Sequence, residues 1–153
     1  MSQGRRPGGL TALAVFNFIG GGVYALFFLV MALVAAFLGA AADAASEDPD
    51  VQEMAKMWEE VGVGWFYLFL AYYAATAFLL LASGVGYIKQ NRFWGRTLGT
   101  VYGVLAIVGV LAYAVMAPEE ADGGFGLRAV VELIYPVLTV ALLNTTFKED
   151  FVR

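Results

Sequence analysis

The stretch LTALAVFNFIGGGVYALFFLVMALVAAFLGAAA, from Leu10 to Ala42, decides the fold, because only Thr11 and Asn17 interrupt its apolar character. A helix of about 20 apolar residues crosses the roughly 30 Å hydrocarbon core of a bilayer. This stretch is long enough to cross with a tilt, or to cross and project beyond the membrane. It therefore predicts a transmembrane helix.

The flanks of this stretch allow a second interpretation, a cleaved secretory signal peptide. Arg5 and Arg6 precede it, and an alanine-rich segment at residues 40–45 resembles a cleavage site. However, the apolar region of a signal peptide has about 7–15 residues, and residues 10–42 far exceed that length. We therefore favour a permanent membrane span.

Three more apolar stretches follow, at residues 63–88, 97–117 and 127–143. The chain has 153 residues, of which 61% are hydrophobic and 14% charged, whereas soluble domains are roughly 45–50% apolar and about 25% charged. A chain of this length leaves about a third of its unfolded surface exposed after folding, so water is a poor solvent for it. The prediction is an all-α integral membrane four-helix bundle that forms a single transmembrane domain over residues 1–153.

The positions of lysine and arginine predict the orientation of the bundle. Cytoplasmic loops are enriched in these residues. In a four-span arrangement only Lys56 and Arg128 fall on one side, and the acidic segments 43–60 and 119–122 fall there too. The other seven bases share the opposite side: Arg5, Arg6, Lys89, Arg92, Arg96, Lys148 and Arg153. We expect a multi-pass protein of the cell membrane, the bacterial cytoplasmic membrane, with both termini in the cytoplasm.

The first outer loop contains a predicted amphipathic helix at about residues 49–61. Apolar residues recur there at three- and four-residue spacing, and acidic residues occupy the other face. We favour a helix that covers the ends of the spans. A docking surface for a basic partner is the alternative, formed by Met54, Trp58, Glu59 and Glu60. Metal binding is a third, although the acids lack the spacing of a calcium loop.

The predicted cytoplasmic loop, residues 89–96, is short, basic and aromatic. Its bases suit anionic lipid headgroups, and Phe93 and Trp94 suit the boundary between headgroups and hydrocarbon. Anchoring of the topology explains this loop without a ligand.

Glycines mark two predicted helix-packing sites. Gly95, Gly99 and Gly103 recur at four-residue spacing, which lets a neighbouring helix approach closely. We favour a neighbour from the same chain over one from another copy. In the first span Gly20, Gly21 and Gly22 predict either a bend or a very tight contact.

Several polar residues fall at membrane depth. Asn17 needs a partner there, and a group on a facing helix is favoured over a substrate. Tyr72 shares a helical face with Thr76 and Ser83, which predicts a hydrogen-bonding seam or the wall of a small polar cavity. Arg128 and Glu132 are four residues apart, so they form an ion pair near the start of the last span or mark a functional site.

The composition removes much catalytic chemistry. The chain has no cysteine and no histidine, which excludes thiolate nucleophiles, Ser-His catalysis and the usual zinc, copper and haem sites. A basic patch for nucleic acid is also missing from the sequence. We expect no catalytic residue, no metal site, no cofactor and no nucleic-acid partner.

The two halves of the chain are weakly similar, at residues 11–16 and 97–102, so a parallel duplication of two hairpins stays open. Three short motifs carry a resemblance to a known group: residues 82–86, residues 93–98, and Tyr135-Pro136 with residues 142–145. With them the chain resembles a loose group of small bacterial four-span membrane proteins without assigned function. The resemblance implies the architecture and no catalytic residues, and it leaves the acidic outer helix unmatched.

Two functions therefore compete. The first is a non-enzymatic accessory, assembly or structural subunit of a homo-oligomer or a larger complex in the lipid bilayer. The second is a small oligomeric transporter or channel. Small multidrug exporters have a similar size, but they use a carboxylate in the first span, which this chain lacks there, so Glu132 would have to serve. A membrane-embedded enzyme ranks third.

Overall fold

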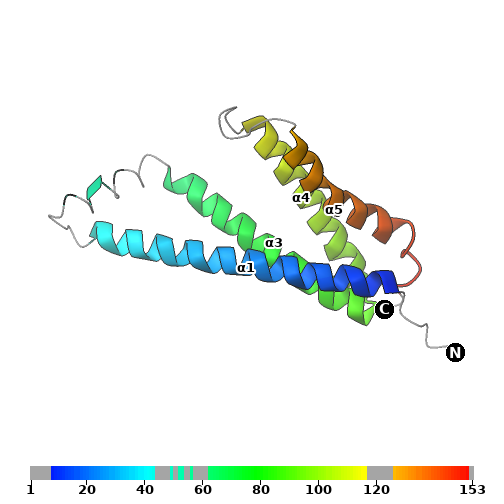
Figure 1. Cartoon of the computed structure of the whole chain (residues 1–153). Helices are drawn as coiled ribbons and strands as arrows, with labels where there is room; N and C mark the ends of the chain where they lie inside the picture. Colours follow the sequence, from blue (N-terminus) through cyan, green and yellow to red (C-terminus); the bar gives the residue numbers. More distant parts are fainter. Residues whose placement is uncertain are drawn as a thin grey trace.

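The computed structural model describes residues 8–43, 49, 52–53, 56, 62–116 and 126–151. Its elements are α1 (Gly8–Asp43), α3 (Val63–Lys89), the π-helix η1 (Arg92–Thr97), α4 (Leu98–Met116) and α5 (Leu127–Asn144) (Figure 1). Within the described residues there is no strand, so the all-helical fold class is confirmed. Most of the expected outer helix at about 49–61 lies outside the described residues.

Among the described residues, four helical stretches are long and apolar enough to cross a membrane: Gly8–Ala40, Gly64–Lys89, Arg92–Val115 and Leu127–Asn144. They fall on the four stretches predicted from hydropathy. The first helix, α1, has 36 residues and is therefore about 54 Å long at 1.5 Å per residue. Because the hydrocarbon core is only about 30 Å thick, α1 is tilted in the bilayer or extends beyond it.

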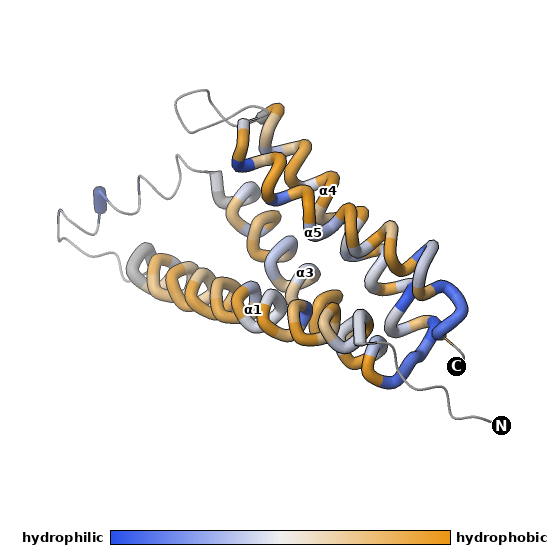
Figure 2. The backbone as a smooth tube through the Cα atoms, turned by 45° about the vertical axis from the view of Figure 1, so that its right-hand side comes forward, coloured by the Kyte–Doolittle hydropathy of each residue, from blue (hydrophilic) through white to orange (hydrophobic). Residues whose placement is uncertain are grey.

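The helices form two hairpins. Helix α1 packs along α3, α4 packs along α5, and the hairpins meet where α3 contacts η1 and α4 (Figure 1). The hairpins lie close together at the end where α1 begins and diverge toward the other end (Figures 1 and 2). The ring of Phe147 lies 2.5 Å from the position that a Cβ on Gly9 would take. The start of α1 and the segment after α5 are therefore at the same end of the bundle.

The connection between the second and third spans differs from the prediction. We expected a loop over residues 89–96, but only Gln90 and Asn91 lie outside the helices. Gln90 adopts a left-handed conformation with φ 49° and ends α3. The side-chain oxygen of Asn91 accepts hydrogen bonds from the backbone N–H groups of Phe93 and Trp94, both at 3.0 Å. This cap starts a helix one turn earlier than hydropathy indicates, because capping does not depend on apolar character.

The core lies where the two hairpins meet. One cluster of buried residues comprises Leu10, Leu13, Ala14, Tyr87, Leu143, Phe147 and Phe151. A second comprises Leu79, Leu80, Tyr102 and Ala106. Large apolar side chains elsewhere on the helices are exposed, as expected for surfaces that face lipid.

Candidate functional site

Three polar side chains from three helices meet inside the bundle and form what we call the polar junction. The amide nitrogen of Asn17 on α1 donates a hydrogen bond to Ser83 Oγ on α3 at 2.7 Å. The Tyr135 hydroxyl on α5 donates to the Asn17 side-chain oxygen. Asn17 and Ser83 are both 0% exposed. The junction therefore ties the two hairpins together where neither water nor lipid reaches the amide.

Small residues allow the junction to form. Asn17 follows Leu13 and Ala14 on the buried face of α1. On the facing helix, a Cβ on Gly84 would lie 3.2 Å from Phe18 Cε1 and 3.4 Å from the Asn17 Cβ, so Gly84 packs closely against this part of α1. One turn further along α1, a Cβ on Gly21 would lie 2.8 Å from Leu81 Cγ. Close approach of α1 and α3 thus brings Asn17 within reach of α3.

The chemistry of the junction is that of a structural network. Its members are an amide and two hydroxyls, which are neutral at physiological pH. The Ser83 hydroxyl donates in turn to the Leu79 carbonyl at 2.6 Å. Polar groups that satisfy one another inside a membrane stabilise helix association.

A second polar cluster lies at the end of the bundle where α5 finishes. The Arg96 guanidinium donates to the Asn144 side-chain oxygen at 3.3 and 3.4 Å. The Asn144 nitrogen donates to Thr100 Oγ1 at 3.1 Å. The sequence does not indicate this cluster, because polar residues are common at the ends of membrane spans.

The glycine stripe of η1 and α4 faces residues of the same chain. A Cβ on Gly95 would lie 2.5 Å from a ring carbon of Phe151, and one on Gly99 would lie 2.1 Å from the Tyr87 hydroxyl. For Gly103 the nearest atom is Cγ2 of Val140, at 2.4 Å. These three glycines therefore lie where α3, α5 and the segment after α5 come closest to η1 and α4.

The glycines of α1 differ from one another. Gly21 lies against Leu81, and Gly20 lies 3.5 Å from Leu80 Cδ1, measured from an added Cβ. Gly22 has no atom within 4 Å of such a Cβ. Only two of the three consecutive glycines therefore face α3.

Arg128 and Glu132 form an ion pair on the surface of α5. Arg128 Nε lies 2.8 Å from Glu132 Oε1, with the two side chains 58% and 42% exposed. The guanidinium also lies 5.3 Å from the centroid of the Tyr113 ring on α4. Within the described residues this is the one ion pair, and about half of its side-chain surface is exposed.

No protein family, curated protein or solved structure matches the chain. Its function must therefore be argued from its own residues. Within the described residues, no group of three or more acidic residues is placed to hold a metal ion. The expected docking residues Met54, Trp58, Glu59 and Glu60 lie outside the described residues.

The polar face expected on α3 is divided in the structure. Ser83 belongs to the junction and Thr76 is buried, whereas a Cβ on Gly109 of α4 would lie 2.7 Å from the Tyr72 hydroxyl. A small cavity of about 240 Å³ opens between α1 and α3, lined by Val23, Tyr24, Phe27 and Tyr73. The sequence does not indicate this cavity, because aromatic residues are common in both spans.

Proposed function

We propose that the chain is a non-enzymatic integral membrane protein that works as a subunit of a homo-oligomer or of a larger membrane-protein complex. Its role would be accessory, assembly or structural. The distribution of lysine and arginine supports a location in the cell membrane with both termini in the cytoplasm.

The exposed ion pair carries this proposal. Glu132 lies about 7.5 Å along α5 from Leu127, within the apolar stretch that is long enough to cross a membrane. Charged side chains at such a depth face protein or a water-filled cavity. Here Arg128 and Glu132 are 58% and 42% exposed, beside the exposed apolar residues Val131 and Ile134. A second protein chain over this face of α5 would remove the pair from lipid.

The polar junction supports a non-catalytic role. Asn17 uses both ends of its amide within the bundle, and Ser83 also donates to the backbone. Groups that are engaged in this way stabilise the subunit and leave little capacity for a substrate.

A photo-crosslinking experiment tests the subunit proposal. The photoreactive residue p-benzoylphenylalanine replaces Val131 beside the ion pair, or Ile19, which is 61% exposed on α1, as the control. We expect a crosslinked product in native membranes for position 131 and much less for position 19. A product at twice the 16.4 kDa mass of the chain indicates a homo-oligomer, and another discrete mass indicates a complex. No product at position 131, together with a monomer in mild detergent, would overturn the proposal.

A small transporter is the second candidate, and the surroundings of Glu132 favour it. Glu132 is an acidic residue within an apolar stretch that is long enough to cross a membrane, and its side chain is 42% exposed. A carboxylate at membrane depth is a suitable coupling group for proton exchange.

Proton flux into proteoliposomes under a potassium diffusion potential tests this candidate. If Glu132 couples transport, Glu132→Gln lowers the flux at least about tenfold, because the amide cannot release a proton at physiological pH. Glu132 is removed as a coupling residue if the variant and the wild type give equal flux, or if the wild-type flux is no higher than that of protein-free liposomes. The subunit proposal expects that equality.

A further inference from the structure

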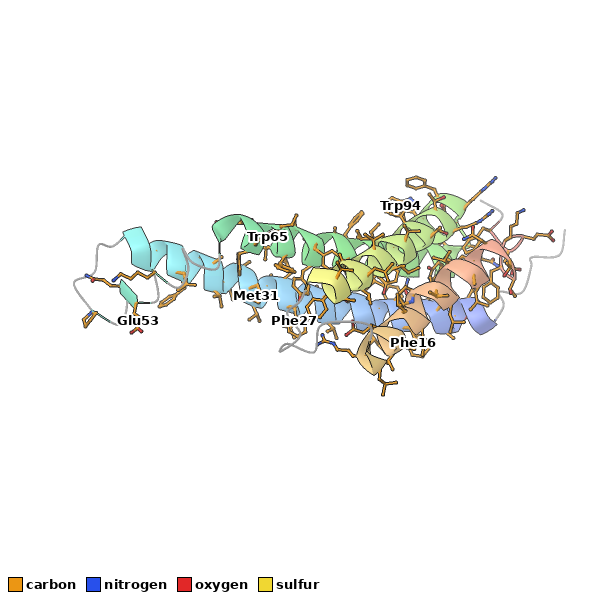
Figure 3. The ribbon with its side chains drawn as sticks, turned by 90° about the horizontal axis from the view of Figure 1, so that it is seen from above. Phe16, Phe27, Met31, Glu53, Trp65 and Trp94 are labelled. Atoms are coloured by element: carbon orange, nitrogen blue, oxygen red, sulfur yellow. The ribbon has the colours of Figure 1, made fainter. Side chains whose placement is uncertain are left out.

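The turn between α3 and η1 combines exposed cations with exposed aromatic rings. Lys89 is the last residue of α3 and Arg92 the first of η1, and both side chains are exposed. Phe93 and Trp94 follow at 58% and 45% exposure, and Figure 3 shows Trp94 pointing away from the helices. Within the described residues no carboxylate pairs with either cation, since the ion pair found there joins Arg128 and Glu132.

The conformation of this turn is held by contacts on its inner side. The Asn91 side chain caps η1. Gly86 of α3 lies directly against the backbone of Gly95, because a Cβ on Gly86 would lie only 2.1 Å from the Gly95 nitrogen. The outward residues are thus carried on a backbone that is fixed before any ligand arrives, which lowers the entropic cost of binding.

The position of the turn along the spans indicates what it meets. Lys89 ends one membrane-spanning stretch and Arg92 begins the next, so both lie at the boundary between hydrocarbon and headgroups. Figure 2 shows hydrophilic residues gathered at this end of the bundle. Aromatic rings are enriched at that depth, and lysine and arginine there are attracted to anionic lipid headgroups.

We propose that this turn binds the headgroup of an acidic phospholipid, with Lys89 and Arg92 on the phosphate and with Trp94 and Phe93 beside the upper acyl chains. The two rings have centroids 6.0 Å apart and stand nearly perpendicular, at 89°. These exposed rings adjoin two cations that have no carboxylate partner in the described part of the chain, and the combination suits a headgroup and its first methylenes. This inference does not depend on the subunit role, because it concerns lipid and not a protein neighbour.

Native mass spectrometry of the full chain in mild detergent tests the proposal. The probes are phosphatidylglycerol and phosphatidylcholine with identical acyl chains. We expect the wild type to retain phosphatidylglycerol in preference to phosphatidylcholine. Arg92→Gln and Lys89→Gln should each weaken retention of phosphatidylglycerol about fivefold, which corresponds to about 1 kcal/mol for one cation in contact with the headgroup.

Lys148→Gln is the matched control, since it removes one exposed positive charge from the segment after α5. The loss in this variant should stay below about twofold, and Arg92→Lys should bind as the wild type does. Equal retention of the two lipids by the wild type would overturn the proposal. An equal loss in Lys148→Gln would also overturn it, because diffuse attraction to the whole surface would then explain the effect.

Discussion

Gly86→Ala is expected to destabilise the protein by about 3 kcal/mol or more, the upper range for forcing extra atoms into a packed interior. The added Cβ would lie 2.1 Å from the Gly95 nitrogen and 2.2 Å from the Trp94 carbonyl carbon. Non-bonded heavy atoms normally stay about 3.5–4.0 Å apart. Both neighbours are backbone atoms, so no side-chain rotation relieves the overlap, and η1 must move away from α3.

Gly22→Ala provides the control for this variant. A Cβ on Gly22 meets no atom within 4 Å, and alanine is favoured over glycine inside a helix by about 0.8–1.0 kcal/mol. The control should therefore be as stable as the wild type or slightly more stable. Unfolding in a titration with sodium dodecyl sulfate, followed by far-UV circular dichroism, measures both variants. Equal stability of the two would contradict the close contact between α3 and η1.

The positions of the spans were predictable because lipid restricts what can cross it. A backbone in hydrocarbon must form helices with apolar side chains, so composition alone marks each crossing. The last span illustrates this, since residues 127–143 were expected and α5 is Leu127–Asn144. Hydropathy does not indicate on which side of the membrane each end of a span lies. That assignment depends on the charges outside the spans, and the cytoplasmic position of the termini stays a prediction.

The start of the third helix was not predictable in the same way. Residues such as Gln90, Asn91 and Arg92 are typical of loops when they are read locally. What makes Arg92–Thr97 helical is the cap by Asn91 together with the contacts of Gly95 with Gly86 and Phe151. Phe151 is far from Gly95 in the sequence, and no local pattern indicates that they meet.

The partners of Asn17 were also beyond local reasoning. A buried amide in a span requires some partner, which follows from the cost of an unpaired polar group. Which partner it finds depends on which helices are adjacent. Residues 10–42 are apolar on all sides, so hydrophobic periodicity shows no buried face and does not select Ser83 or Tyr135.

Asn17→Leu is expected to lower the free energy of unfolding by about 2 kcal/mol. Leucine has the same branching and the same number of side-chain heavy atoms as asparagine, so the change removes hydrogen bonds and keeps the shape of the side chain. It leaves the Tyr135 hydroxyl without its acceptor and Ser83 Oγ without its donor. A buried polar group that loses its partner costs about 1–3 kcal/mol, although hydrogen bonds between membrane helices average only about 0.6 kcal/mol in double-mutant cycles. Tyr135→Phe, which removes only one of these bonds, should cost about 1 kcal/mol.

A double-mutant cycle separates the Asn17–Tyr135 hydrogen bond from the rest of the junction. If the bond forms, Asn17→Leu with Tyr135→Phe should be less destabilising than the sum of the single changes, because each single change already breaks it. Tyr67→Phe is the control, since Tyr67 lies on α3 away from the junction and is 56% exposed. That control should change stability by less than about 0.5 kcal/mol. Strict additivity of the two junction variants, or a Tyr67→Phe loss as large as that of Asn17→Leu, would contradict the junction as the link between the hairpins.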